Sequence, residues 1–254
     1  MEIFRRAPLL IEAGTYSGGT GTDHYKKFFH NSIAHNTIQI VDPSEAEDAG
    51  NQRFYNNQNQ GTIQEYLSNE KNEYGDIIAY RDEDGWAYLA ADFTAAYTPE
   101  RVKRVVRELV WLGERYLVVV DNISLSEGRF QPRVLWHYPV IPLVEAKRFT
   151  VSDAGARAVV NVLAPAEAVI DTVAAFTVGT HQYPPQRPDP SLGAGRAEIR
   201  VRQTGRLDYT FVQVIDVADN TEAPQAFSLA GRAGSERFIF PPAGFSANSG
   251  YLYL

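Results

Sequence analysis

The sequence predicts an all-β protein built as a large antiparallel β-sandwich with several sheets. Apolar and polar residues alternate along many segments, which is the two-residue period of a half-buried strand. Groups of Gly, Pro, Asp and Asn recur about every 8–12 residues, a turn spacing typical of sandwiches. Aromatic residues make up 12% of the chain, with 14 Tyr and 13 Phe, and such side chains fit a pleated surface.

The chain is long enough for one large β domain. It has 254 residues, of which 44% are apolar, an ordinary fraction for a globular protein. All-β sandwiches often reach this length as a single unit. We therefore expect one domain over residues 1–254, with residues from about 196 to 254 as a potential small C-terminal subdomain.

The first expected strand begins at the first residue. Met1 to Ile11 has the pattern of a strand with a turn-forming proline at Pro8. A domain that begins inside a sheet indicates a segment upstream, so we expect this chain to be one part of a longer protein.

The strands that follow differ in their expected burial. Leu117–Val120 is a short apolar run, as expected for a central strand, with a turn predicted at Asp121. Arg196–Arg202 alternates charged and apolar residues, which predicts one solvent-facing side. Pro99–Leu112 has a helix-like spacing, but its β-branched residues favour a pair of strands. Further strands are expected at Thr37–Val41, Arg133–Tyr138, Tyr209–Ile215 and Arg237–Phe240, and long loops at residues 42–61 and 181–195.

Charge and composition exclude several classes of partner and site. The net charge of −7 argues against binding to nucleic acid or to an anionic membrane surface. The absence of cysteine excludes disulfides and thiolate metal sites, but leaves sites built from His and Asp. No apolar run is long enough for a membrane span, and the start of the chain lacks the pattern of a signal peptide.

Residues suited to an acidic sugar gather near the N-terminus. Three of the five histidines, His24, His30 and His35, lie within twelve residues, next to Tyr25 and two lysines. Histidine and tyrosine are common proton-transfer groups, and a local cluster of His, Tyr, Lys and Arg can bind uronic acids on an otherwise acidic protein.

An ordered series of motifs carries a family resemblance. Ala34–Thr37 (AHNT), followed by an alternating strand and Asp42, resembles a signature of the C-terminal β-sandwich domain of heparinase II/III-type polysaccharide lyases. Leu9–Tyr16 resembles the entry strand of that domain. The likeness is closest to the heparinase II branch, and the series continues with Asp48–Arg53, Asp92–Tyr97, Val118–Asp121, Leu135–His137 and Val214–Asn220.

The resemblance implies an α/α toroid followed by a multi-sheet β-sandwich, and β-elimination on uronic-acid glycans such as heparan sulfate or alginate. In that family the toroid supplies most of the proton-transferring groups, and this chain lacks the toroid. We therefore expect the chain alone to be inactive and to work with a toroid encoded upstream or supplied in trans. The resemblance further implies an acidic polysaccharide as partner, a periplasmic or extracellular full-length protein, and potentially a homodimer.

The resemblance also suggests site residues. His35 matches the histidine of the family's sandwich domain, and either faces the cleft as a catalytic residue or binds metal. Zinc is the expected metal, with manganese or calcium as alternatives, although relatives place a second histidine where this chain has Asp92. The expected metal ligands are His35, Asp48 and Asp92, and the expected substrate-binding residues are His24, Tyr25, Arg53 and Tyr55.

Each of these residues has a simpler interpretation. His35 could be a buried histidine bonded to a carbonyl group, and Asp48 and Asp92 could be turn residues. His137 fits packing better than ligand binding. The whole chain could be a non-catalytic carbohydrate-binding or structural module. A galactose-mutarotase-like enzyme ranks last, because no glutamate accompanies the histidines in a paired-strand pattern.

Overall fold

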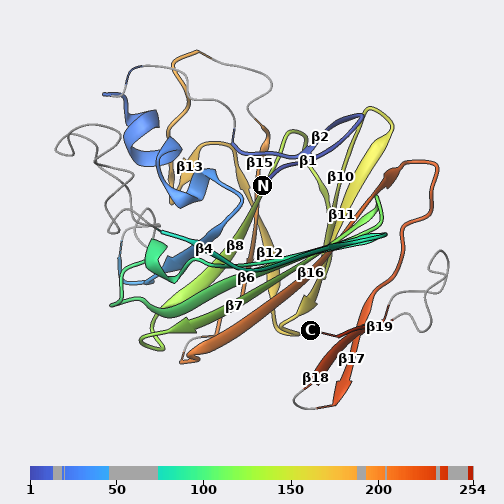
Figure 1. Cartoon of the computed structure of the whole chain (residues 1–254). Coiled ribbons are helices and arrows are strands. Elements are labelled where there is room, and N and C mark those ends of the chain that lie inside the picture. The colour runs from blue at the N-terminus through green and yellow to red at the C-terminus, as the bar shows by residue number, and fades with distance from the viewer. Residues whose placement is uncertain are drawn as a thin grey trace, which may run out of the picture.

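The computed structural model describes residues 1–13, 19, 21–45, 74–187, 193–203, 205–232, 235–239 and 251–253. Its described residues form five antiparallel sheets, so the all-β prediction is confirmed (Figure 1). None of the described helices is long and apolar enough to cross a membrane.

The largest sheet has eight strands in the order β4-β5-β6-β7-β16-β11-β10-β9. Every neighbouring pair in it is antiparallel. Its strands are β4 (Asp76–Glu83), β5 (Trp86–Asp92), β6 (Val102–Leu112), β7 (Tyr116–Leu125), β9 (Leu143–Glu145), β10 (Arg148–Asp153), β11 (Ala156–Ala164) and β16 (Asp208–Asp219).

A four-stranded sheet in the order β12-β15-β8-β3 forms the second main layer. It comprises β3 (Ile38–Val41), β8 (Gln131–Tyr138), β12 (Val169–Ala174) and β15 (Gly195–Arg200). The smaller sheets are formed by β1 (Ile3–Arg5) and β2 (Ala7–Leu10), by β13 (Thr177–Val178) and β14 (His181–Gln182), and by β17 (Ser228–Arg232), β18 (Ser235–Ile239) and β19 (Tyr251–Tyr253). Three short helical turns complete the described elements: η1 (Tyr25–Phe29), η2 (Ser32–Ala34) and η5 (Thr94–Ala96).

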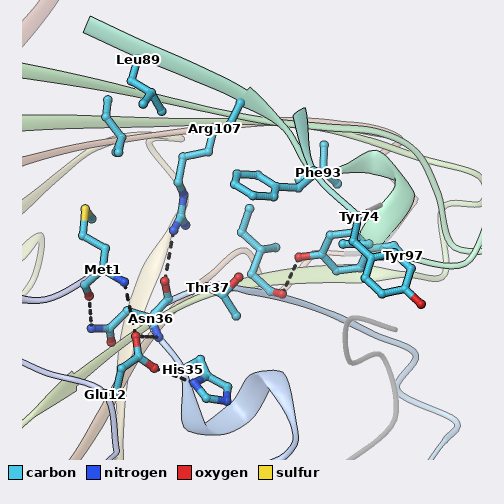
Figure 2. Close-up of a pocket in the computed structure, with 16 residues that line it drawn as sticks. Met1, Glu12, His35, Asn36, Thr37, Tyr74, Leu89, Phe93, Tyr97 and Arg107 are labelled. Atoms are coloured by element: carbon cyan, nitrogen blue, oxygen red, sulfur yellow. Dashed lines mark hydrogen bonds and ion pairs between the residues drawn. The ribbon is translucent and has the colours of Figure 1, made fainter. Parts of the chain in front are cut away.

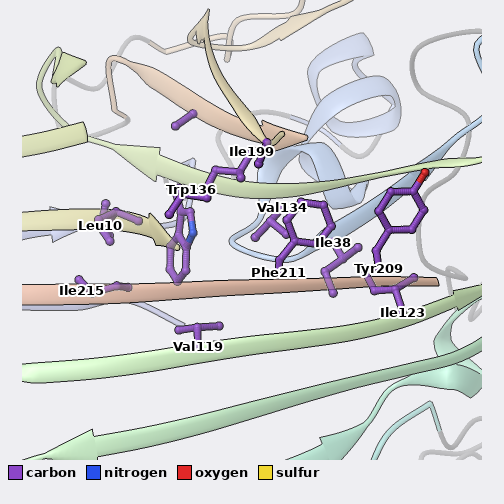
Figure 3. Close-up of a cluster of buried hydrophobic side chains, with 14 of the residues drawn as sticks. Leu10, Ile38, Val119, Ile123, Val134, Trp136, Ile199, Tyr209, Phe211 and Ile215 are labelled. Carbon is purple, nitrogen blue, oxygen red and sulfur yellow. The ribbon is translucent and has the colours of Figure 1, made fainter. Parts of the chain in front are cut away.

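The main core lies between the two large sheets. Phe211 of β16 packs in one cluster with Trp136 of β8 and Ile199 of β15, and all three are fully buried (Figure 3). The indole N–H of Trp136 donates to Oε1 of the buried Gln213 at 2.5 Å, so the polar atom of the indole has a partner inside the core. The contact joins β8 to β16 and fixes the two sheets against each other.

Two strand predictions need correction. Residues 102–112 form the single strand β6 instead of a strand pair, because their β-branched residues continue one ladder with β5 and β7. The turn expected at Asp121 is absent, since β7 runs on to Leu125. The carboxylate of Asp121 is fully buried and pairs with Arg107, which explains how a charged residue is accommodated inside a central strand.

The solvent-facing side expected for Arg196–Arg202 is found only at its end, where the Arg202 side chain is 66% exposed. Arg196 and Glu198 are 2% and 3% exposed, and they form an ion pair of 2.8 Å. Arg196 also donates to the carbonyl oxygen of Thr177 at 2.7 Å, which places β13 over this face of the four-stranded sheet. β15 and β16 lie within the two main sheets, while the subdomain expected from about residue 196 stays a prediction.

Both edges of the eight-stranded sheet carry exposed apolar side chains. On β4, Ile77 and Tyr80 are 68% and 66% exposed. Near β9, Ile141 and Leu143 are 85% and 68% exposed. Among the described residues each edge strand has a single partner, β5 for β4 and β10 for β9.

Candidate functional site

His35 lies where the turn η2 leads into β3, and its ring is held on both sides. η2 ends at His35, whose backbone is extended. Nδ1 of the ring lies 2.7 Å from Oε2 of Glu12, and Nε2 lies 3.1 Å from the carbonyl oxygen of Phe29 (Figure 2). The His35 side chain is 42% exposed, so it is fixed in orientation while still accessible.

The partners of His35 determine its protons. A carboxylate oxygen and a carbonyl oxygen only accept hydrogen bonds, so both ring nitrogens must donate. Both bonds form together only when the ring is an imidazolium, paired with the Glu12 carboxylate. Such a group can neutralise an anion or donate a proton, and it offers no lone pair in this orientation.

Glu12 is stabilised as a carboxylate. Burial, the largest single influence, would raise the pKa, but the hydrogen bond and charge of His35, the charge of the N-terminus and the N–H of Asn36 together lower it below the usual value of 4.5. The second carboxylate oxygen accepts the backbone N–H of Asn36 at 3.3 Å. Glu12 thus ties the end of β2 to the loop that carries His35.

Replacing Glu12 with glutamine tests this ion pair through pH. Because the folded-state pKa of Glu12 is lowered, its contribution to stability is present above 4.5 and is lost as the pH falls through the folded-state value. The wild type should therefore exceed the Gln variant in unfolding free energy at neutral pH, and the gap should close in acid. Urea denaturation at several pH values measures it, and a gap that does not change with pH would contradict the pairing.

A cavity of about 540 Å³ opens beside this pair. One wall comes from Glu12 and the start of β3, and the opposite wall comes from β5, β6 and η5, as Figure 2 shows. The walls are largely apolar, with charged groups at one end. Its lining includes Glu12, His35, Asn36, Thr37, Ile38, Tyr74, Leu89, Phe93, Tyr97, Val105, Arg107 and Leu109.

Asn36 and Arg107 connect the elements around this cavity through hydrogen bonds. The buried Asn36 side chain donates to the carbonyl oxygen of Ile11 at 3.2 Å and accepts the backbone N–H of His137 at 2.7 Å. The backbone carbonyl oxygen of Asn36 accepts a hydrogen bond from Nη1 of Arg107 at 3.2 Å. The asparagine of the AHNT motif is therefore a structural link between the β1–β2 hairpin and both main sheets.

The two described residues expected to contact substrate lie beside η1. His24 is only 4% exposed, and its ring packs among Phe28, Phe29 and Phe176. Its Nδ1 donates to the carbonyl oxygen of Tyr183 at 2.7 Å. In this conformation the ring of His24 supports neighbouring residues and does not face solvent. Tyr25 packs against His30, with ring centres 3.5 Å apart, and contact of either residue with sugar stays a prediction.

The remaining predicted site residues separate into two groups. Asp48, Arg53 and Tyr55 lie outside the described residues. Asp92 ends β5, and its Oδ1 accepts the backbone N–H of Thr94 at 2.8 Å, as a turn residue does. His137 is buried, which agrees with the packing role preferred for it, and burial, helped by the charge of Arg196, lowers its pKa to about 3.

The described residues do not assemble the donor set of a metal site. No group of three His, Cys, Asp or Glu side chains suited to a metal occurs among them, and both nitrogens of His35 already donate. Metal binding by His35 would require loss of one of its two hydrogen bonds. Elemental analysis of the wild type and His35→Ala, purified without chelator, tests the sequence prediction: bound metal that falls on substitution would support it.

Sequence reasoning missed Glu12 and Arg107 as parts of this site. Glu12 stands in the quoted entry motif as its acidic residue, but nothing local shows that its partner is 23 positions away. Arg107 lies in a strand whose pattern only predicts packing.

The family profile described as "Heparinase II/III-like, C-terminal" matches residues 3–225. The chain belongs to this family. The match spans most of the chain and includes Glu12, His35, Asn36 and Arg107, so these residues lie within the family domain.

Solved heparinases share the fold. A heparinase III with methylated lysines has a TM-score of 0.67 and 11% identity, covering 100% of this chain and 34% of that one. Heparan sulfate lyase HepC from Pedobacter heparinus has a TM-score of 0.63 and 11% identity, covering 98% of this chain and 34% of that one. At this identity the likeness shows the fold and does not decide between the heparinase II and III branches. No curated protein sequence matches the chain.

This chain spans about a third of the length of these solved heparinases.

Proposed function

We propose that this chain is the β-sandwich part of a polysaccharide lyase that acts by β-elimination on uronic-acid glycans resembling heparan sulfate or alginate. The observation that carries the proposal is the Glu12–His35 ion pair at the edge of a cavity, in a chain of the heparinase II/III-like family. HepC, which shares its fold, is described as a heparan sulfate lyase.

The geometry supports a chemical role for His35. The short bond from Nδ1 to Glu12 fixes the ring, while the longer bond from Nε2 to the Phe29 carbonyl oxygen can be exchanged for a substrate oxygen. An imidazolium there would neutralise the uronate carboxylate or protonate the leaving oxygen, and both lower the barrier to elimination.

Elimination also needs a base, and two lining groups that could act as one are already engaged: Glu12 is bonded to His35, and Tyr97 to a backbone carbonyl oxygen. The hydroxyl of Tyr97 donates to the carbonyl oxygen of Ile38 at 2.7 Å and is buried. We therefore propose that the helical toroid of the family supplies the base, in the same protein or in trans, and that these 254 residues alone show little or no lyase activity.

The test compares the chain alone with the chain joined to or mixed with its helical partner. Heparan sulfate, alginate and neutral dextran are the substrates, and ultraviolet absorbance of the unsaturated uronate product is the readout. The combined protein should cleave a uronate glycan, and His35→Ala should lower the rate by about 100-fold or more.

Two results would overturn parts of this proposal. Strong product formation by the chain alone would refute the need for a partner. Binding of uronate glycans without elimination in any combination would favour the alternative, a non-catalytic carbohydrate-binding module.

A further inference from the structure

A second surface of the described chain lies beside His35 and combines lysines with aromatic rings. η1 packs against the β13–β14 hairpin, and Figure 1 shows the blue turn of η1 next to β13. The hairpin and η1 are far apart in the sequence, since His24 and Tyr183, which bond to each other, are separated by 159 positions. We call the group of Lys26, Lys27, His181 and Tyr183 the lysine–tyrosine surface.

Backbone hydrogen bonds of Tyr183 hold the aromatic half of this surface in place. The carbonyl oxygen of Tyr183 accepts from Nδ1 of His24 at 2.7 Å, and its backbone N–H donates to the carbonyl oxygen of Phe176 at 2.8 Å. The ring of Tyr183 stacks with that of His181, with centres 6.4 Å apart and planes at 21°. His181 is exposed and Tyr183 is half-buried, so Tyr183 supports His181 as the exposed ring of a stacked pair.

The charged half comes from η1. Lys26 and Lys27 are both exposed, and the Nζ of Lys27 lies 5.3 Å from the centre of the Tyr183 ring. Lys27 also pairs with Asp23 at 3.4 Å, in a contact where both side chains are largely exposed. Exposed pairs of this kind contribute little energy, so an anionic ligand can replace the carboxylate of Asp23.

The lysine–tyrosine surface is continuous with His35 through Phe29. The carbonyl oxygen of Phe29, the last residue of η1, accepts from the ring of His35 at 3.1 Å, and the two rings lie 6.2 Å apart. A chain of sugars that reaches His35 can therefore continue over η1 toward Tyr183. Flat aromatic rings suit the apolar face of a sugar, and ammonium groups suit its carboxylate or sulfate.

We propose that the lysine–tyrosine surface is a subsite for an anionic sugar of the glycan that binds at His35. The inference rests on the proposed function, because it assumes a uronate glycan at His35. It assigns the sugar contact on this side to Tyr183 and His181, and gives the buried His24 the role of positioning Tyr183.

Calorimetric titration of the 254-residue chain with heparan sulfate and alginate oligosaccharides tests the subsite. The variants are Lys26→Gln combined with Lys27→Gln, and Tyr183→Leu. The control is Lys103→Gln combined with Arg104→Gln, which removes the same charge from exposed positions on β6, outside the surface. Circular dichroism confirms that each variant is folded.

The double lysine variant should bind about tenfold more weakly, since each exposed charge pair changes affinity by up to about fivefold. Tyr183→Leu should also weaken binding, and the control should match the wild type. Higher salt should weaken the wild type more than the double lysine variant, because salt screens exposed charges.

Two outcomes would overturn the subsite. One is a double lysine variant that binds as tightly as the wild type, which leaves the lyase proposal intact. The other is a wild-type chain that binds neither glycan, because all four residues of the surface are present in it. The lyase proposal fails separately, through absence of elimination in the presence of the helical partner.

Discussion

Replacement of Arg107 with leucine is expected to lower the unfolding free energy by about 3–5 kcal/mol, the typical cost of leaving one charge of a buried pair without its partner. Arg107 forms two hydrogen bonds with Asp121, of 2.6 and 3.0 Å, and the Asp121 side chain is fully buried. The substitution leaves the Asp121 carboxylate in the core and also removes the donor to the Asn36 carbonyl oxygen.

The matched control is the double variant Arg107→Leu with Asp121→Leu. It replaces the whole pair with apolar side chains, which is often close to neutral, so it should recover most of the lost stability. Guanidinium denaturation measures the shift in midpoint at constant slope. A cost below about 1 kcal/mol for the single variant would show that the pair behaves like a solvated one.

Replacement of Asn36 with alanine is expected to cost about 2–4 kcal/mol, because it leaves buried backbone groups without partners, at roughly 1–3 kcal/mol each. The groups affected are the carbonyl oxygens of Met1 and Ile11 and the N–H of His137. Urea denaturation measures the loss.

Thr37→Ala is the neighbouring control, since the Thr37 side chain makes no hydrogen bond to any described residue and a change of about 0.5 kcal/mol or less is expected there. Equal losses for Asn36→Ala and Thr37→Ala would show that the bonds of Asn36 are not limiting for stability.

The strands could be predicted from the sequence because alternation of side chains is a local property. What covers each face of a sheet is not local, and this explains the error at Arg196 and Glu198. Arg196 and Glu198 would alternate with apolar residues in the same way on a solvent-exposed face as on a face covered by β13. Only the contact of Arg196 with Thr177 shows that this face is covered.

The same reasoning applies to the candidate site. His35 was found because it stands in a short motif. Its partner Glu12 belongs to a different element, and the residues that build the lysine–tyrosine surface come from two ends of the chain. Nothing in the proline-rich sequence around His181 indicates what packs beside it, and the sequence predicts substrate contact for His24 although its ring is buried.

The exposed apolar side chains at the two edges of the large sheet bear on how the chain behaves in solution. Each edge strand has one partner among the described residues, so an edge with exposed side chains such as Ile77, Tyr80 and Leu143 can accept a strand from another molecule. Arg81, Asp82 and Glu83 on β4 oppose this by charge, whereas β9 has only Glu145 as a charged residue. In concentrated samples, we therefore expect a strand of another molecule to add first at β9. The substitution Leu143→Lys is the natural change for preparing the chain at high concentration.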